Sequence, residues 1–385
     1  MQVNSVREAL PTLPVTVLTG FLGSGKTTIL NHLVNDPALS RTLVLINEFG
    51  EVGLDHDLVT RGSEDATFVE MSSGCLCCSI RGDLVRTLRE APARFARDGV
   101  CWFDQVLIET TGLADPAPIL HTLMAEPAIT RRYELAGVVT VVDALNGLST
   151  LETQPESVKQ VAVADALLVT KTDLTEGTIP EALGQTLARL NPGAPPVVAP
   201  QGRVDAQWLS RIGLYDPETK TPDVRRWLQQ EVPQEHGHGH GHGHGHGHGH
   251  GHGHGHHDAH DHDQDHHHHD VNRHGPDIRA FSVVRDEPLS LMMLENWLDI
   301  LRSTLGEQLL RVKGILNVDG YSRPVIIHGV QHVLHPVDVL DQWPDEDHRT
   351  RIVFITRGIA RESIEGMLNA FSTASPTAPT SHPTD

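Results

Sequence analysis

The stretch that decides the fold runs Gly20-Phe21-Leu22-Gly23-Ser24-Gly25-Lys26-Thr27, directly after the apolar, β-branched run 15–18. Glycines at this spacing let backbone N–H groups curl around phosphate oxygens. Lys26 then reaches the β- and γ-phosphates, and Thr27 offers Mg²⁺ a hydroxyl. A predicted helix over residues 27–34 adds its positive dipole end. The pattern predicts a phosphate loop that binds a nucleoside triphosphate, rather than a turn that is merely rich in glycine.

Length and composition predict two or three globular domains. The chain has 385 residues, of which 38% are hydrophobic, enough for a buried core in each domain. No apolar run reaches the length of a membrane span, and residues 1–14 lack an apolar signal segment, so we expect a cytoplasmic protein without a membrane partner. The net charge of −20 argues against nucleic acid as the main partner, because clustered Lys and Arg carry phosphate-backbone binding.

Short apolar runs alternate with helix-like stretches over residues 1–215, which is typical of a mostly parallel sheet flanked by helices. The expected strands are residues 15–18, 43–46, 106–108, 138–142, 167–170 and 196–198. We therefore predict an α/β fold of the P-loop NTPase class for this region.

The rest of the chain divides at a histidine-rich tract, residues 236–274, which holds nineteen of the 27 histidines. It has almost no apolar side chains to bury, so residues 216–276 are predicted to be a disordered linker. Residues 277–371 are predicted to form a smaller α/β domain, and 372–385 a frayed tail. Its expected strands are residues 311–318, 325–328 and 351–356, framed by helices 289–305 and 361–371.

A candidate for the Mg²⁺ shell is Glu109, which closes the apolar strand 106–108 and begins Glu109-Thr110-Thr111-Gly112. The amide of Gly112 can contact a γ-phosphate and so detect whether that phosphate is present. The alternative is an ordinary acid at the end of a strand.

The run Thr170-Lys171-Thr172-Asp173 ends strand 167–170 and resembles the guanine-binding N-K-x-D pattern. Asp173 would accept hydrogen bonds from the guanine N1–H and exocyclic amine, which adenine cannot supply. Thr170 replaces the usual Asn, so we expect weaker nucleotide affinity. An ATP-dependent phosphotransferase is the alternative that Asp173 argues against.

Three cysteines crowd into Gly74-Cys75-Leu76-Cys77-Cys78, whereas Cys101 stands alone and is expected to pack in the core. In a reducing compartment, clustered thiolates suit Zn²⁺, Cu⁺ or Fe–S chemistry. The motif lacks a fourth ligand for tetrahedral Zn²⁺, which Glu48 or a water can supply, and an open position suits metal transfer. The alternatives are a redox pair and a packing coincidence.

Together these motifs resemble the CobW family of P-loop GTPases and metallochaperones over nearly the whole chain. The matching stretches, in family order, are residues 20–28, 46–55, 73–84, 109–116, 311–314 and 349–356. The resemblance implies GTP hydrolysis coupled to delivery of Zn²⁺ or Co²⁺ to a client metalloenzyme, with the three clustered cysteines as ligands. Glu109 matches the acid that the family usually has at its Walker B position.

The predicted site has nucleotide-binding, catalytic and metal-binding parts. For GTP and Mg²⁺ it comprises Gly20, Gly23, Ser24, Gly25, Lys26, Thr27, Thr28, Gly112, Lys171 and Asp173, with Lys26 and Glu109 as catalytic residues. For metal it comprises Cys75, Cys77, Cys78 and Glu48, with Thr27 on Mg²⁺. No arginine finger is evident, so we expect one from a partner or from a second protomer of a nucleotide-dependent homodimer.

The histidine tract is predicted to buffer metal or to load the main site, because dense neutral imidazoles bind Zn²⁺, Ni²⁺, Co²⁺ and Cu²⁺ with little geometric preference. The alternative is a hydrated spacer. His328, His332 and His335 are expected to be surface or core histidines, since on one strand the first two share a face and the third does not.

Two further functional classes stay open. One is a GTP-dependent maturation factor for a cobalt or iron enzyme. The other is a regulatory GTPase that uses the cysteines for redox sensing.

Overall fold

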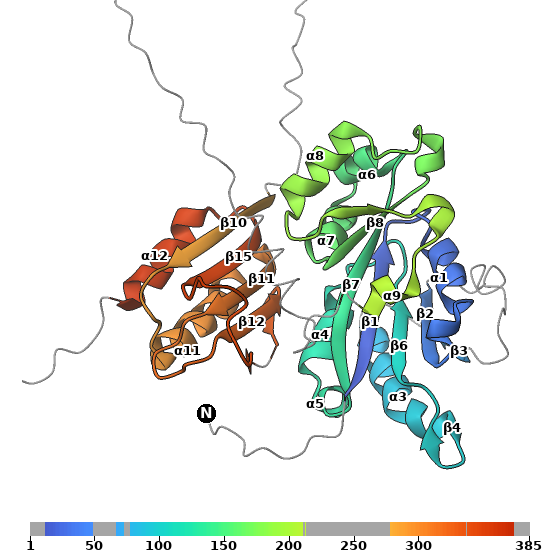
Figure 1. Cartoon of the computed structure of the whole chain (residues 1–385), viewed down its shortest axis with the longest axis horizontal. Coiled ribbons are helices and arrows are strands. Elements are labelled where there is room, and N and C mark those ends of the chain that lie inside the picture. Colours follow the sequence, from blue (N-terminus) through green and yellow to red (C-terminus); the bar gives the residue numbers. More distant parts are fainter. Residues whose placement is uncertain are drawn as a thin grey trace, which may run out of the picture. The chain divides into compact units, whose positions relative to one another are not determined.

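The computed structural model describes residues 12–48, 67–72, 78–210, 212, 278–335 and 337–372 (Figure 1). The predicted linker 216–276, with its histidine tract, lies outside these residues. The described part forms a seven-stranded sheet, a six-stranded sheet and a two-stranded ribbon. Both large sheets belong to one compact unit of the chain.

The seven-stranded sheet is parallel throughout, in the order β3-β2-β6-β1-β7-β8-β9. Its strands are β1 Leu13–Gly20, β2 Thr42–Glu48, β3 Thr67–Ser72, β6 Gln105–Glu109, β7 Tyr133–Asp143, β8 Ala166–Thr170 and β9 Pro196–Val198. All six strands expected from the sequence are confirmed, and β3 was missed. Because every strand runs the same way, the loops that follow the strands gather at one edge.

Helices cover both faces of this sheet. They are α1 Lys26–Val34, α3 Cys78–Arg94, α4 Ala117–Ala125, α5 Pro127–Thr130, α6 Gly147–Thr153, α7 Pro155–Ala162, α8 Glu181–Leu190 and α9 Ala206–Ser210. Short 3₁₀ turns are η1 Pro37–Leu39, η2 Thr172–Leu174 and η3 Pro200–Gly202, and the ribbon is β4 Ala96–Arg97 with β5 Val100–Cys101.

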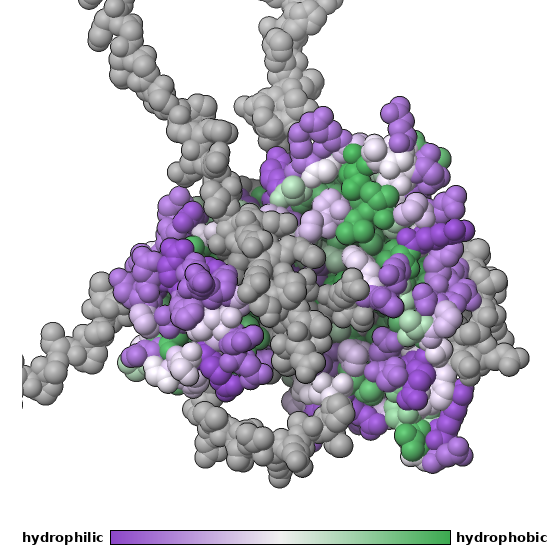
Figure 2. Space-filling view, in the orientation of Figure 1, coloured by the Kyte–Doolittle hydropathy of each residue, from purple (hydrophilic) through white to green (hydrophobic). Residues whose placement is uncertain are grey.

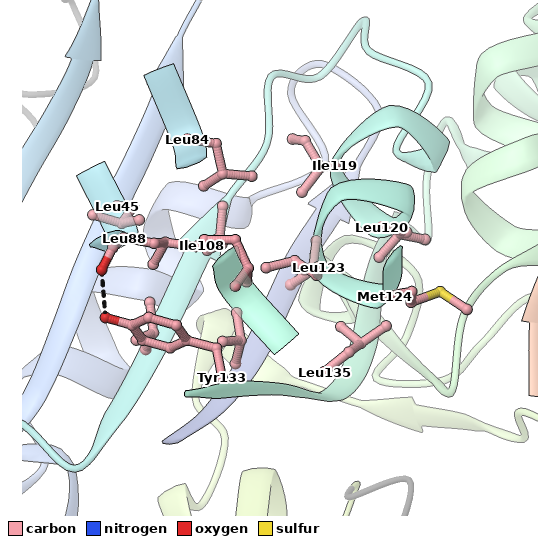
Figure 3. Packing of buried hydrophobic residues seen from close by; sticks show 14 of the residues in the cluster. Leu45, Leu84, Leu88, Ile108, Ile119, Leu120, Leu123, Met124, Tyr133 and Leu135 are labelled. Carbon is pink, nitrogen blue, oxygen red and sulfur yellow. Dashed lines mark hydrogen bonds between the residues drawn. The ribbon is translucent and has the colours of Figure 1, made fainter. Parts of the chain in front are cut away.

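Alternate residues of the central strand β7 pack on opposite faces of the sheet, as the two-residue period of a strand requires. Val138 packs in a cluster with residues of α3 and α4, whereas Val139 packs in another with residues of α1. Figure 3 shows the first cluster, in which the hydroxyl of Tyr133 donates to the carbonyl of Leu88 at 2.7 Å. Two apolar layers therefore hold the sheet rigidly between its helices.

The second domain has an antiparallel sheet in the order β10-β15-β11-β12-β13, with β14 also paired to β12. Its elements are β10 Ile278–Arg285, α11 Leu291–Ile300, η4 Leu301–Leu305, η5 Gly306–Gln308, β11 Leu309–Leu316, β12 Val325–Val330, β13 Val333–Leu334, β14 Asp338–Val339, β15 Thr350–Arg357 and α12 Arg361–Ser372. Trp297 and Phe354 are fully buried at its core. The three expected strands and both helices are confirmed, and β10 was missed.

No helix among the described residues combines the length and the apolarity that a membrane crossing requires.

Candidate nucleotide-binding site

The phosphate loop joins the end of β1 to the start of α1 and depends on glycine at three positions. A Cβ on Gly20 would lie 2.4 Å from the carbonyl oxygen of Val141, and Gly23 and Gly25 have φ of +75° and +96°. Other side chains would clash or be strained there. The N-cap of α1 is Gly25, with no side-chain cap, so the first amides of the helix can bind an anionic ligand.

Lys26 and Thr27 start α1 at the base of this loop. Lys26 is buried, and its Nζ donates to the carbonyl of Phe21 at 3.3 Å, which keeps the ammonium beside the loop. Thr27 Oγ1 donates to Glu109 Oε1 at 3.2 Å, although 82 residues separate them. A hydroxyl and a carboxylate side by side below a phosphate loop are the oxygen donors that Mg²⁺ prefers, so this pair fits the ion.

The loop after β6 lies directly against the phosphate loop. A Cβ on Gly112 would lie 2.5 Å from the backbone of Leu22, so only glycine allows this approach. Ser24 Oγ and Thr111 Oγ1 are buried and have no hydrogen-bond partner among the described residues. Buried polar atoms usually have partners, and phosphate oxygens or metal-bound water would supply them here.

The predicted guanine-binding run follows β8. Asp173 lies on η2 and is exposed, so its carboxylate is accessible to a base. Thr170 is buried instead, and its hydroxyl donates to the carbonyl of Ser24 at 2.6 Å. Thr170 therefore supports the phosphate loop from behind, a role that the sequence did not predict, while weaker nucleotide affinity stays a prediction.

Asp143, which ends β7 as Glu109 ends β6, was not predicted from the sequence. Lys171, in the left-handed region at φ +57°, donates to Asp143 Oδ2 at 2.5 Å. Burial alone would raise the pKa of Asp143, but hydrogen bonds from Lys171, from the Asn146 side chain and from backbone amides outweigh it and lower the pKa. The position of an acid at the end of an apolar strand was the signal that could have identified it.

Four leucines are exposed on the loops that follow β1, β6, β7 and β8: Leu22, Leu113, Leu145 and Leu174. They lie at the same edge of the sheet as the phosphate loop. Figure 2 shows apolar surface gathered over the region of α6 and β8. The nucleotide site thus has apolar as well as polar surroundings.

The predicted metal site is described only in part. Glu48 ends β2 and Cys78 begins α3, but their side chains, together with Cys75 and Cys77, lie outside the described residues. In the sheet register, Ile46 is opposite Glu109, so the backbone of Glu48 lies at the nucleotide edge. Among the described residues no group of three or more His, Cys, Asp or Glu is arranged to hold a metal ion.

Cys101 packs at the edge of the core, as expected, and its Sγ donates to the carbonyl of Phe103 at 3.3 Å. His328 is buried on β12 and His332 is exposed in the following turn, which also agrees with the expectation. The three histidines do not lie on one strand, contrary to the expectation, because the chain reverses at Gln331, with φ +53°. The amide of His335 donates back to the carbonyl of His328.

Comparison with known proteins identifies the two domains. Residues 14–198 match the nucleotide-binding domain described as CobW/HypB/UreG, and residues 278–372 match the cobalamin synthesis protein cobW C-terminal domain. The chain belongs to the CobW family. The resemblance seen in the sequence motifs is confirmed for both domains, and the homologues are GTP-binding P-loop proteins of the CobW family.

Individual relatives of this CobW-family chain are named for zinc. The zinc chaperone YjiA of Escherichia coli is 29% identical over 91% of this chain and 96% of its own length. The zinc-regulated GTPase metalloprotein activator 1 of Schizosaccharomyces pombe is 34% identical over 51% of this chain and 48% of its own. The crystal structure of Zn(II)-bound YjiA GTPase superposes with a TM-score of 0.62 at 26% identity, covering 94% of this chain and 99% of that one.

Proposed function

We propose that this protein is a GTP-hydrolysing metallochaperone that binds Zn²⁺, or Co²⁺, through Cys75, Cys77 and Cys78 and delivers it to the apo form of a client metalloenzyme. The observation that carries the proposal is the contact of Thr27 with Glu109 beneath the phosphate loop, in a chain whose relatives are named zinc chaperone and zinc-regulated GTPase. GTP hydrolysis gates the release of the metal.

The described residues of the nucleotide site have separate roles. Lys26 holds the β- and γ-phosphates, and Thr27 with Glu109 holds Mg²⁺, which neutralises charge on the phosphates. Asp173 selects guanine, because an exposed carboxylate at this edge becomes buried under the base and must then be paired. The amide of Gly112 contacts the γ-phosphate from a loop already packed on the phosphate loop.

The metal part is tied to the nucleotide part through two strands. β2 and β3 pair in register up to Glu48 and Ser72, and both end at the edge that carries Glu109. The segments 49–66 and 73–77 therefore start from the nucleotide edge, and the second contains Cys75 and Cys77. One change at the γ-phosphate can bias both segments, and GTP binding then favours a closed trio of thiolates.

The test is thermodynamic linkage in the full-length chain. We expect Zn²⁺ to bind at least tenfold more tightly to the protein loaded with a non-hydrolysable GTP analogue than to the GDP form, with the same factor for nucleotide affinity when zinc is present. Cys77→Ser is the matched control, because the histidine tract is unchanged and the difference isolates the cysteine site. Equal zinc affinities in the two nucleotide states would overturn the proposal.

Two measurements separate the other classes. Metal analysis of untagged protein distinguishes a zinc carrier from a cobalt or iron maturation factor by the ion that copurifies at one per chain. A disulfide that forms under mild oxidant, without any bound metal, would favour redox sensing instead.

A further inference from the structure

Helix α7 holds the loop that approaches the γ-phosphate position. Gln160 is fully buried, and its side-chain amide donates to the carbonyls of Gly112 at 3.3 Å and Ala114 at 3.0 Å. The neighbouring Lys159 Nζ donates to Asp115 Oδ2 at 2.7 Å. Because the donors are buried or half-buried, the loop cannot shift without moving α7 or breaking these bonds.

The same segment reaches the C-terminal domain a few residues later. Ala162, the last residue of α7, packs against Leu310 of β11 and Ile355 of β15. Asp165 then accepts the backbone amide of Val138 at 2.9 Å through Oδ2, and through Oδ1 it accepts Lys313 Nζ at 2.6 Å.

Arg311 completes this ion cluster by donating from Nη2 to the same Oδ1. The side chains of Asp165 and Arg311 are only 4% and 5% exposed. Separating a buried carboxylate from its cations leaves uncompensated charge, so the cluster tolerates little displacement. Both cations that the C-terminal domain contributes to this cluster therefore converge on one residue, Asp165, of the nucleotide-binding domain.

Strand β8 starts directly after Asp165 and returns to the nucleotide. All five of its residues are buried, and its last residue, Thr170, donates to the carbonyl of Ser24 in the phosphate loop. A strand of this length spans about 15 Å and is stiff because it is hydrogen-bonded on both sides. A movement at Asp165 is thus transmitted to the phosphate loop.

We infer that residues 155–170 couple the nucleotide site to the C-terminal domain, with Asp165 as the positioning residue at which that domain acts. The inference rests on the proposed nucleotide site and adds its regulation. Docking holds β8 in place and so favours GTP, while α7 makes the coupling sensitive to the γ-phosphate through Gln160. By reciprocity, GTP strengthens docking by the factor by which docking strengthens GTP binding.

The test removes the cluster from the side remote from the nucleotide, with Arg311→Met in the full-length chain. The matched control is Arg351→Met, because Arg351 is also a buried arginine of this sheet but binds Asp345 at 2.9 Å and 3.0 Å within its own domain. Affinities for a fluorescent GTP analogue and for GDP are measured, together with amide hydrogen exchange of β8 and β11 in both states.

We expect Arg311→Met to weaken binding of the GTP analogue at least fivefold, to weaken GDP less, and to abolish the nucleotide dependence of exchange in β11. Arg311→Lys keeps the charge, so it should recover at least half of the affinity that Arg311→Met loses, measured on a logarithmic scale. Arg351→Met keeps both affinities within twofold of the unmodified chain. If Arg311→Met does not fold, Lys313→Met carries the same test, because Lys313 is 22% exposed and its removal disturbs the core less.

Three outcomes would contradict either the proposed function or the coupling. Unmodified protein that binds neither nucleotide contradicts the proposed function itself. If Arg311→Met binds both nucleotides as tightly as the unmodified chain does, only the coupling is contradicted. Equal losses in Arg311→Met and Arg351→Met would also contradict it, because general destabilisation of the C-terminal domain would then account for the effect.

Discussion

Two carboxylates at opposite ends of the central strands show how burial decides what an ion pair does. Asp143, at the carboxyl end of β7, pairs with Lys171, whose side chain is 35% exposed. Asp165, before β8, pairs with Arg311, whose side chain is 5% exposed. Lys171 can leave its partner and be hydrated, because the buried Asp143 keeps hydrogen bonds from Asn146 and from backbone amides. Arg311 cannot separate without leaving two buried charges. One edge of the sheet suits ligand exchange, and the other suits permanent docking.

The pKa values of the two acids point the same way. In both, burial alone would raise the pKa; Lys171 with neutral hydrogen-bond donors outweighs burial at Asp143, and Arg311 with Lys313 outweighs it at Asp165. Arg311 and Lys313 lower the pKa of Asp165 to about 2. The docking acid therefore stays ionised, and its pair intact, at neutral and mildly acidic pH.

The largest effect is expected from Asp165→Ala, which removes the carboxylate of the buried ion cluster. Two cations lose their carboxylate, so the free energy of unfolding should fall by about 3–5 kcal/mol. Urea unfolding of the full-length chain measures this loss. A change below 1 kcal/mol would mean that water already solvates the cluster.

Next in size is Lys26→Ala at the nucleotide-binding edge of the sheet, which should affect nucleotide binding much more than folding. Loss of the ammonium removes a charged contact with phosphate, so affinity for GTP should fall at least ~100-fold, or about 2.7 kcal/mol. In the fold, loss of the bond to Phe21 costs about 1 kcal/mol. Titration with the fluorescent analogue and urea unfolding test both parts; undiminished GTP affinity would contradict the site.

A smaller effect is expected from Asp143→Asn, which removes the charge of the pair with Lys171 as Asp165→Ala removes that of the buried pair. Lys171 is accessible to water, so the free energy of unfolding should fall by only about 1 kcal/mol. The ratio of the two losses, from parallel urea titrations, measures how much burial contributes. Comparable losses at the two acids would remove the distinction between an exchanging and a docking edge.

The smallest effect concerns pH and His328, which is buried beside Arg311, Lys313, Asp165 and His335. Burial first, and then Arg311, hold its pKa well below 6.5. A lowered histidine pKa means that the unfolded chain takes up the proton first, so this stability is present above about pH 6.5 and is lost below it. Between pH 7 and 5.5 the loss should be about 1 kcal/mol.

Replacing this histidine supplies the control for the pH experiment. Both ring nitrogens of His328 lack a hydrogen-bond partner among the described residues, so His328→Leu strands no polar group. Its urea unfolding should depend less on pH over that interval than unfolding of the unmodified chain. An unchanged slope would show that another group titrates.

Much of the fold followed from the sequence, because buried parallel strands are continuous apolar runs. The two missed strands that are longer than two residues, β3 and β10, lie at sheet edges, where one side is unpaired. Most residues of β10 are only half-buried or exposed, so polar side chains are tolerated there. Arg279 and Ser282 interrupt its apolar residues, which therefore do not form a continuous run. Edge strands are therefore where pattern alone was insufficient.

The nucleotide chemistry was predictable from residues that are neighbours in the chain, because a phosphate loop is specified by local backbone geometry and a few fixed side chains. Which distant groups meet was decided by folding. Gln160 lies inside a helix with no motif to mark it, and Asp165 and Arg311 are 146 residues apart. Only packing of two cores brings such charges together, because the attraction between single ions in water is too weak to order so long a chain.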